Sequence, residues 1–274
     1  MLNINPFKRI SYIENGIAEF KKMDIINAIG VMIFYVIATI FMSVLFMKDK
    51  AGFSLKIFIF NGVKILLIFT VLINLFYYWY SIIIDEKNIC KKTPKKITIK
   101  NVFYITIALL GFRIISSYLT IFILAPFSKV LMPKFMLKAV SETIEISFFI
   151  YVCIIGPAME EFVFRGVILT GLLKKYSVKK SIIISALLFG IMHLNGIQFI
   201  NGFLLGVLLG YIYVRTKSIY LCMYSHILFN TMGVIFMYIP KINNLLVTVL
   251  FAIVAFIFMI YGIKKIDNFR NGGL

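Results

Sequence analysis

The chain has 274 residues, of which 61% are hydrophobic, and its mean hydropathy is +0.98. This apolar share is far above that of a soluble domain, so the composition excludes a soluble protein and indicates an integral membrane protein. The net charge of +18 would suggest nucleic-acid binding in a soluble protein, but here the basic residues lie in loops between apolar runs. Anionic lipids account for the charge, and we expect no nucleic acid as a partner.

The first predicted element is a cytoplasmic amphipathic segment over residues 1–24. Its apolar residues recur at helical spacing and leave the basic residues on the other faces, as in helices that lie in the membrane interface. The residues that share the apolar face are Phe7, Ile10, Ile13, Ile17 and Phe20. We interpret this segment as an anchor beside the membrane.

About eight apolar stretches follow as candidate transmembrane helices, although a full span needs roughly 20 residues. They cover residues 25–47, 57–84, 102–126, 144–173, 181–194, 199–214, 219–239 and 245–263. The fifth and sixth are short, and Asn195-Gly196 interrupts the run between them, so we interpret them as two helices, with a re-entrant pair as the alternative. The predicted fold class is all-α: a polytopic integral membrane protein with about eight transmembrane helices.

The chain is predicted to form one transmembrane domain over residues 25–264, followed by a cytoplasmic tail over residues 265–274. Most basic residues outside the spans fall on one side of the membrane if the N-terminus is cytoplasmic. The positive-inside rule therefore places both termini on the cytoplasmic side of a cell membrane. The abundance of Ile, Lys, Asn and Phe is typical of an AT-rich bacterial genome, so we expect a bacterial protein.

Polar residues inside the apolar runs are concentrated after residue 141. An ionisable side chain at bilayer depth costs on the order of 3 kcal/mol on insertion scales, so it usually faces a partner or a water-filled cavity and marks a functional site. In the first half, Lys64 and Arg113 are expected to snorkel or to pair. The polar residues of the second half are Glu160, Glu161, Arg165, His193, His226 and Asn230.

Helical spacing relates these residues to one another. Glu161 and Arg165 are four residues apart, so they can pair on one helical face, while Glu160 is rotated by about 100° and stays outside that pair. The pair would support the site by fixing the helix and by keeping a second unpaired charge away from Glu160. His226 and Asn230 are also four residues apart and project to one side of a single helix.

Proline and glycine add two further predictions about these helices. Pro157 is expected to kink the fourth span just before the acids and to leave backbone carbonyls for water. Gly202, Gly206 and Gly210 recur at four-residue spacing in one helix, which allows close approach of a neighbouring helix in lipid. We interpret this stripe as a packing surface and not as a ligand loop.

Three motifs on successive predicted helices, EExxxR, FxxxH and HxxxN, are present in order between Glu160 and Asn230. They resemble the three motifs of the type II CAAX prenyl endopeptidases, also called the CPBP or Abi family of intramembrane proteases. The use of the only two histidines in the chain makes the resemblance specific. It implies an intramembrane endopeptidase of eight-helix architecture.

The resemblance also implies a role for each motif residue. Glu160 would be the general base that deprotonates a water molecule, with His193 helping to orient that water. His226 and Asn230 would hold the developing oxyanion and the water. A carboxylate with a role of this kind can also return the proton to the leaving amine.

Zinc is the competing interpretation of the same residues. Two imidazoles and one carboxylate can form a three-ligand catalytic zinc site, and the candidate ligands are Glu160, His193 and His226. No HExxH motif is present, and the histidines come from separate helices. We therefore favour a glutamate mechanism without a cofactor, with zinc as the alternative.

The sequence thus predicts an endopeptidase that hydrolyses a peptide bond in a membrane-associated peptide or protein tail. The alternative function is a non-catalytic membrane scaffold or bacteriocin self-immunity protein of the same fold. Prenylated substrates are not expected in a bacterium, and neither the substrate nor the oligomeric state follows from the sequence.

Overall fold

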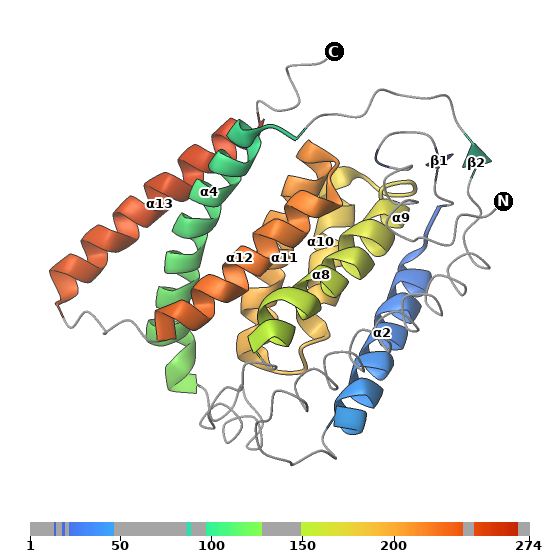
Figure 1. Ribbon diagram of the computed structural model, residues 1–274, viewed down its shortest axis with the longest axis horizontal. Coiled ribbons are helices and arrows are strands. Elements are labelled where there is room, and N and C mark those ends of the chain that lie inside the picture. Colours follow the sequence, from blue (N-terminus) through green and yellow to red (C-terminus); the bar gives the residue numbers. More distant parts are fainter. Residues whose placement is uncertain are drawn as a thin grey trace, which may run out of the picture.

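The computed structural model describes residues 14, 18–19, 22–46, 87–88, 97–127, 149–237 and 244–267. Nearly all of these residues are helical, so the predicted all-α class is confirmed (Figure 1). In this part of the chain the only extended pairing joins β1 (Ala18–Glu19) to β2 (Lys87–Asn88), two antiparallel strands of two residues each.

Four helical stretches among the described residues are long and apolar enough to cross a membrane. They are Ile99–Leu124, Gly196–Thr216, Ile219–Phe236 and Leu245–Ile266. The helix α2 (Ile25–Phe46) adds 22 apolar-rich residues, whereas the predicted stretch 57–84 lies outside the described residues. The fold is that of a membrane protein, and the predicted count of eight spans is not confirmed.

The remaining helices follow the predicted stretches in order. The third stretch consists of α4 (Ile99–Tyr118), the π-helix η1 (Leu119–Leu124) and the 3-10 helix η2 (Ala125–Phe127). The fourth contains η3 (Tyr151–Ile155), α8 (Gly156–Glu161), η4 (Phe162–Leu169) and α9 (Thr170–Leu172). The last four are α10 (Val178–Ile191), α11 (Gly196–Thr216), α12 (Ile219–Met237) and α13 (Leu245–Asp267).

The chain turns sharply between α10 and α11, at the break that the sequence predicts. Leu194 adopts a positive φ of 57°, and the side chain of Asn195 caps α11 by accepting a hydrogen bond of 2.8 Å from the backbone N–H of Gln198. Such an N-cap satisfies a donor that the first helical turn leaves free. The two stretches are therefore separate helices that pack as an antiparallel hairpin.

The glycine stripe of α11 is a packing surface, as predicted. A Cβ added to Gly206 would lie 2.9 Å from Cα of Ala186, and one added to Gly210 would lie 3.1 Å from the side chain of Ile182. A Cβ at Gly202 would meet the ring of His193 at 3.4 Å. Small residues thus bring α11 close to α10 and to the imidazole at the end of α10.

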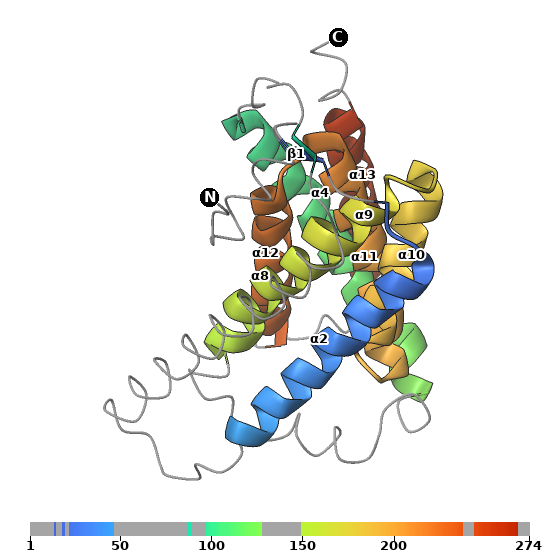
Figure 2. The ribbon, with the colours of Figure 1, turned by 90° about the vertical axis from the view of Figure 1, so that its right-hand side faces the viewer.

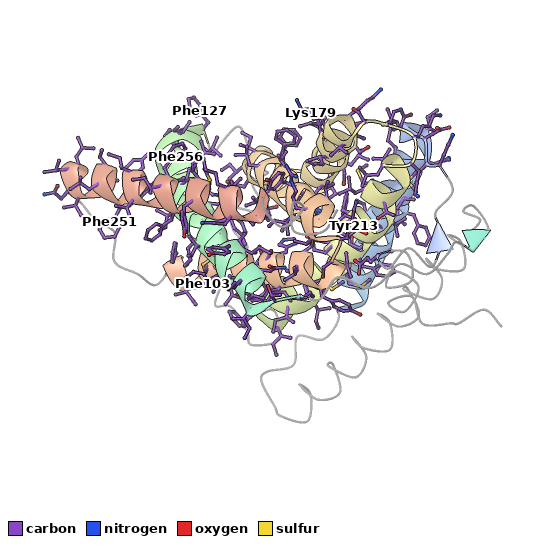
Figure 3. The ribbon with its side chains drawn as sticks, turned by 90° about the horizontal axis from the view of Figure 1, so that it is seen from above. Phe103, Phe127, Lys179, Tyr213, Phe251 and Phe256 are labelled. Carbon is purple, nitrogen blue, oxygen red and sulfur yellow. The ribbon has the colours of Figure 1, made fainter. Side chains whose placement is uncertain are left out.

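At one edge of the bundle, α13 packs along α4, at the side farthest from α2 (Figure 1). A Cβ at Gly262 would lie 2.7 Å from Ala108, so glycine permits this close contact. The outer faces of the pair carry large exposed apolar side chains such as Phe103 and Phe251, which point away from the bundle (Figure 3). These surfaces suit contact with lipid.

The start of α2 is joined to the end of α9. The backbone N–H of Met23 donates to the carbonyl of Gly171 at 3.1 Å, and Lys175 forms an exposed ion pair with Asp24. Figure 2 shows α2 beside α10, which it contacts together with η4. Most of the predicted amphipathic segment 1–24 lies outside the described residues, but Glu14 is described and accepts a hydrogen bond from the N–H of Ile219 at the start of α12.

Candidate active site

Glu160 and Glu161 lie at the end of α8, between the π-helical segments η3 and η4. Departures from α-helical geometry of this kind frequently occur at functional sites. The two neighbouring acids have different surroundings, because the side chain of Glu161 is fully buried whereas that of Glu160 is 20% exposed. Of the two acids, only Glu160 can therefore be reached by water.

Pro157 determines how this helix joins α12. The N–H of Gly156 bonds the carbonyl of Tyr151, five residues back, and in this register residue 157 would bond the carbonyl of Val152. Proline has no N–H, so that carbonyl is left for another donor. The side-chain amide of Asn230 donates to it at 2.9 Å. The sequence predicted carbonyls freed for water, and the structure gives this carbonyl a side-chain partner instead.

Glu161 is the centre of a buried network. Its Oε1 accepts a hydrogen bond of 2.8 Å from Nη1 of Arg165, which confirms the pair that the i, i+4 spacing predicts. The same oxygen lies 2.8 Å from Nδ1 of His226, a contact between helices that motif spacing does not predict. Because a charge-assisted hydrogen bond is strong in a buried site, Glu161 fixes both side chains at once.

Arg165 extends this network to α10 and α11. Its Nη2 donates to the carbonyl of Gly206 at 3.1 Å, and its Cζ lies 4.7 Å from the ring centroid of Phe189. The ring of Phe189 also makes edge contacts with His193 and His226, at centroid distances of 5.2 and 5.5 Å. The phenylalanine of the FxxxH motif therefore packs against three of the predicted site residues.

The two ring nitrogens of His226 face different acids. Nδ1 meets Glu161, and Nε2 lies 3.7 Å from Oε2 of Glu160. The second distance is too long for a direct hydrogen bond but short enough for the two groups to share a water molecule or a substrate atom. His226 is buried, so its orientation depends on Glu161.

His193 lies just beyond the end of α10, which agrees with the predicted position near the end of a helix. Its Nδ1 is 2.9 Å from the carbonyl of Phe189. A carbonyl can only accept, so Nδ1 carries the hydrogen and Nε2 is the free acceptor in the neutral ring. His193 interacts electrostatically with Glu160 and is half-buried, which allows Nε2 to meet water.

Two tyrosines near Glu160 were not identified from the sequence. Tyr35 of α2 is buried, packs edge-on against Phe164 with centroids 6.2 Å apart, and interacts electrostatically with Glu160. Tyr151 of η3 interacts with the same carboxylate. No sequence signal distinguishes these residues, because tyrosine is common in apolar helices and neither belongs to a spaced motif.

The arrangement thus joins Glu161, Arg165 and His226 by hydrogen bonds and places Glu160 3.7 Å from His226. His193 lies within electrostatic reach of Glu160, and Asn230 is hydrogen-bonded to Val152 of η3, which precedes the two acids. Among the described residues, no group of three or more His, Cys, Asp and Glu side chains is arranged to hold a metal ion. Each histidine uses Nδ1 within the protein, which leaves its Nε2 for water, substrate or another ligand.

Comparison with known proteins agrees with the motifs. Residues 142–232 match the family described as "Type II CAAX prenyl endopeptidase Rce1-like", and this segment contains all six predicted site residues. The chain is also 33% identical over 92 residues to the Bacillus subtilis (strain 168) protein named "Putative membrane peptidase YdiL". That match spans 34% of this chain and 38% of the Bacillus protein. No solved structure matches the chain.

Proposed function

Because residues 142–232 match the type II CAAX prenyl endopeptidase family, we propose that the protein is an intramembrane endopeptidase in which Glu160 activates the attacking water. The observation that carries the proposal is the contrast between the two adjacent acids. Glu161 is buried and bound by Arg165 and His226, whereas Glu160 is partly exposed and faces Nε2 of His226 across 3.7 Å. A general base needs a carboxylate that water can reach.

Hydrolysis proceeds through proton transfer at Glu160. Its carboxylate takes a proton from water as the oxygen attacks the scissile carbonyl carbon, and a tetrahedral oxyanion forms. The proton then passes from Glu160 to the leaving amide nitrogen as the carbon–nitrogen bond breaks. This transfer returns Glu160 to its ionised form. The products are a carboxylic acid and an amine, which become a carboxylate and an ammonium group when the acid proton passes to the amine.

The histidines and Asn230 provide the polar environment of this step. In the protonated ring of His226, Nδ1 donates to Glu161 and Nε2 can donate to the oxyanion, since both nitrogens then carry hydrogens. One N–H of the Asn230 amide is held by Val152, and the second is available as another donor. His193 accepts from the water through Nε2. Preorganised donors of this kind typically lower the barrier by several kcal/mol, about 3 for one donor.

We place Glu161 and Arg165 among the positioning residues. They hold His226 in its orientation and keep the charge of Glu161 paired, so that Glu160 is the acid that changes protonation. This assignment explains why two adjacent glutamates occur where one base would be enough for the chemistry.

The substrate is proposed to be a membrane-associated peptide or protein tail, because the site is built from residues inside apolar helices. The protein would lie in a bacterial cell membrane with both termini in the cytoplasm, and its basic loops would contact anionic lipids. These basic residues include Lys174 and Lys175 before α10 and Lys179 and Lys180 in its first turn.

Comparative peptidomics tests this function. Membranes that contain the wild-type protein should release peptides that are absent when Glu160 is changed to Ala at equal protein level. A scaffold or immunity protein would keep its biological effect without this carboxylate. Identical peptide profiles for the two proteins, with the biological effect retained, would support the scaffold and contradict the peptidase.

A further inference from the structure

Arg113 is an intramembrane cation that the proposed chemistry does not use. It lies on α4 and faces α12, where its Cζ is 4.6 Å from the ring centroid of Phe229. A Cβ added to Gly233 would lie 2.9 Å from Nη2 of Arg113, so the guanidinium lies directly against the backbone of α12 at this glycine. The absence of a side chain at Gly233 leaves room for it.

No hydrogen bond or ion pair within the described part of the chain satisfies this guanidinium. Its Nε is buried without a hydrogen-bond partner, and its contact with Phe229 supplies only a cation–π interaction. Arg165 provides a contrast in its Nη atoms, which donate to Glu161 and to the carbonyl of Gly206, although its Nε is likewise buried without a partner among the described residues. From the sequence, Arg113 is expected to snorkel or to pair, and within the described residues it has an aromatic neighbour but no anion. An ionisable residue inside the membrane without a protein partner indicates a functional role.

Arg113 contacts α12 close to the residues that this helix contributes to the candidate active site. Phe229 is next to Asn230, and Gly233 follows His226 by seven residues, which puts the two within about 20° of one another around the helix. At a rise of about 1.5 Å per residue, the guanidinium lies roughly 5 to 10 Å beyond Asn230 and His226 along this face.

The same face of α4 also reaches α11. Ser116 and Thr120, which follow Arg113 by three and seven residues, hydrogen-bond the side-chain amide of Asn201 at 2.8 Å each. The neighbouring residue Gly202 lies against His193. Arg113 therefore projects from the face of α4 that contacts α11, which packs against His193, and α12, which carries Asn230.

We propose that Arg113 binds a carboxylate of the substrate, two or three residues from the scissile bond. This inference rests on the proposed peptidase function. An extended chain spans about 3.3 Å per residue, so two or three residues cover the distance from the reacting groups to the guanidinium. Guanidinium binds carboxylate through two parallel hydrogen bonds, and the N–H donors of Arg113 have no hydrogen-bond partner among the described residues.

The depth of Arg113 in the membrane favours a carboxylate of the substrate over a lipid phosphate as its ligand. Arg113 is 14 residues from the start of α4 at Ile99, which is about 21 Å along the helix, in a stretch of 26 residues. The guanidinium thus lies near mid-depth, away from either headgroup layer. The carboxylate is supplied either by a free C-terminus or by an acidic side chain, and the two sources are separable with synthetic peptides.

The test uses matched peptides that the wild-type protein cleaves in detergent or liposomes. Each sequence is made with a C-terminal carboxylate or a C-terminal amide, and with Glu or Gln two or three residues from the cleavage site. One carboxylate form should be preferred by about 10- to 100-fold in kcat/KM, mainly through KM.

Arg113→Gln should abolish the preference and Arg113→Lys should retain part of it. Arg215→Gln, which loses a cation–π contact with Tyr211, is the matched control and should keep the preference.

A binding experiment distinguishes failure of this inference from failure of the proposed peptidase function. Fluorescent carboxylate and amide peptides are titrated into Glu160→Gln and into Glu160→Gln/Arg113→Gln, with thermal unfolding as the check on folding. Loss of the carboxylate preference only in the double variant supports the inference, even if the wild type cleaves nothing and the peptidase function fails. Equal binding of all peptides by Glu160→Gln overturns the inference. It is also overturned if Arg113→Gln changes only the requirement for anionic lipid and leaves peptide binding unchanged. If Arg113→Gln does not fold, Arg113→Lys is used instead. An unchanged carboxylate preference in Arg113→Lys would then overturn binding of the carboxylate through two parallel hydrogen bonds from Arg113.

Discussion

The Nδ1 atom of His226 lies 2.8 Å from Oε1 of Glu161, the same oxygen that receives Nη1 of Arg165 at 2.8 Å. One carboxylate oxygen thus joins a histidine of the HxxxN motif to the arginine of the EExxxR motif. The second oxygen of Glu161 is buried without a hydrogen-bond partner in the described residues, so the stability of this group depends on the shared oxygen.

Glu161→Gln should destabilise the protein strongly, because it leaves the buried Arg165 without its counter-charge. Removing one member of a buried pair typically costs roughly 3 to 5 kcal/mol. The free energy of unfolding in detergent measures the effect. Asp24→Asn is the control, because its ion pair with Lys175 is exposed and should contribute less than about 1 kcal/mol. Equal losses in the two variants would contradict the buried network.

Asn230→Ala should lower both stability and activity, since it removes the donor to the Val152 carbonyl as well as a donor near the oxyanion. The stability loss is expected at about 1 kcal/mol. In a Pro157→Ala background, residue 157 regains an N–H that can bond Val152, so Asn230→Ala should then cost less stability while activity stays low. A double-mutant cycle of unfolding and turnover checks this coupling. Additive stability effects would show that Pro157 does not determine the partner of Val152.

Burial raises the pKa of Glu14 from 4.5 to about 7, although the N–H of Ile219 and the charge of Lys217 act in the opposite direction. The folded state therefore holds the proton more tightly than the unfolded state, and the free energy of unfolding should fall as the pH rises from about 4.5 to about 7. Glu14→Gln should remove this part of the pH dependence. Unfolding midpoints measured across this range for both proteins check it, and identical curves would show that Glu14 is not buried against α12.

Metal removal should leave the activity intact. The three candidate ligands Glu160, His193 and His226 do not form a metal-holding group among the described residues. After exhaustive chelation, we expect turnover to persist and the zinc content to stay far below one ion per chain. Loss of turnover on chelation, with recovery on adding stoichiometric zinc, would establish the zinc alternative.

The sequence predicted the local parts of the site because helical spacing fixes which residues share a face. The Glu161–Arg165 pair, the glycine stripe of α11 and the break at Asn195 all follow from short-range rules. The start of α12 at Ile219 and of α13 at Leu245 also match the predicted stretches.

Contacts between helices could not be predicted in the same way. The Glu161–His226 contact joins residues 65 positions apart, and the Asn230–Val152 bond joins residues 78 positions apart. The spacing of a motif gives the direction of a side chain from its own helix but not the rotation of that helix toward its neighbours. For the same reason the position of Tyr35 beside Glu160 and that of Arg113 against Phe229 emerge only from the packed structure.

The central claim is that Glu160, and not its neighbour, activates water for peptide hydrolysis. Turnover of a cleaved peptide by purified, reconstituted Glu160→Gln tests it most directly, with thermal unfolding as the check on folding and Asp24→Asn as the carboxylate control. The account predicts a loss of about three orders of magnitude in turnover with an unchanged unfolding midpoint, the range expected when a general base is removed. Turnover by Glu160→Gln at a rate near that of the wild type would contradict it.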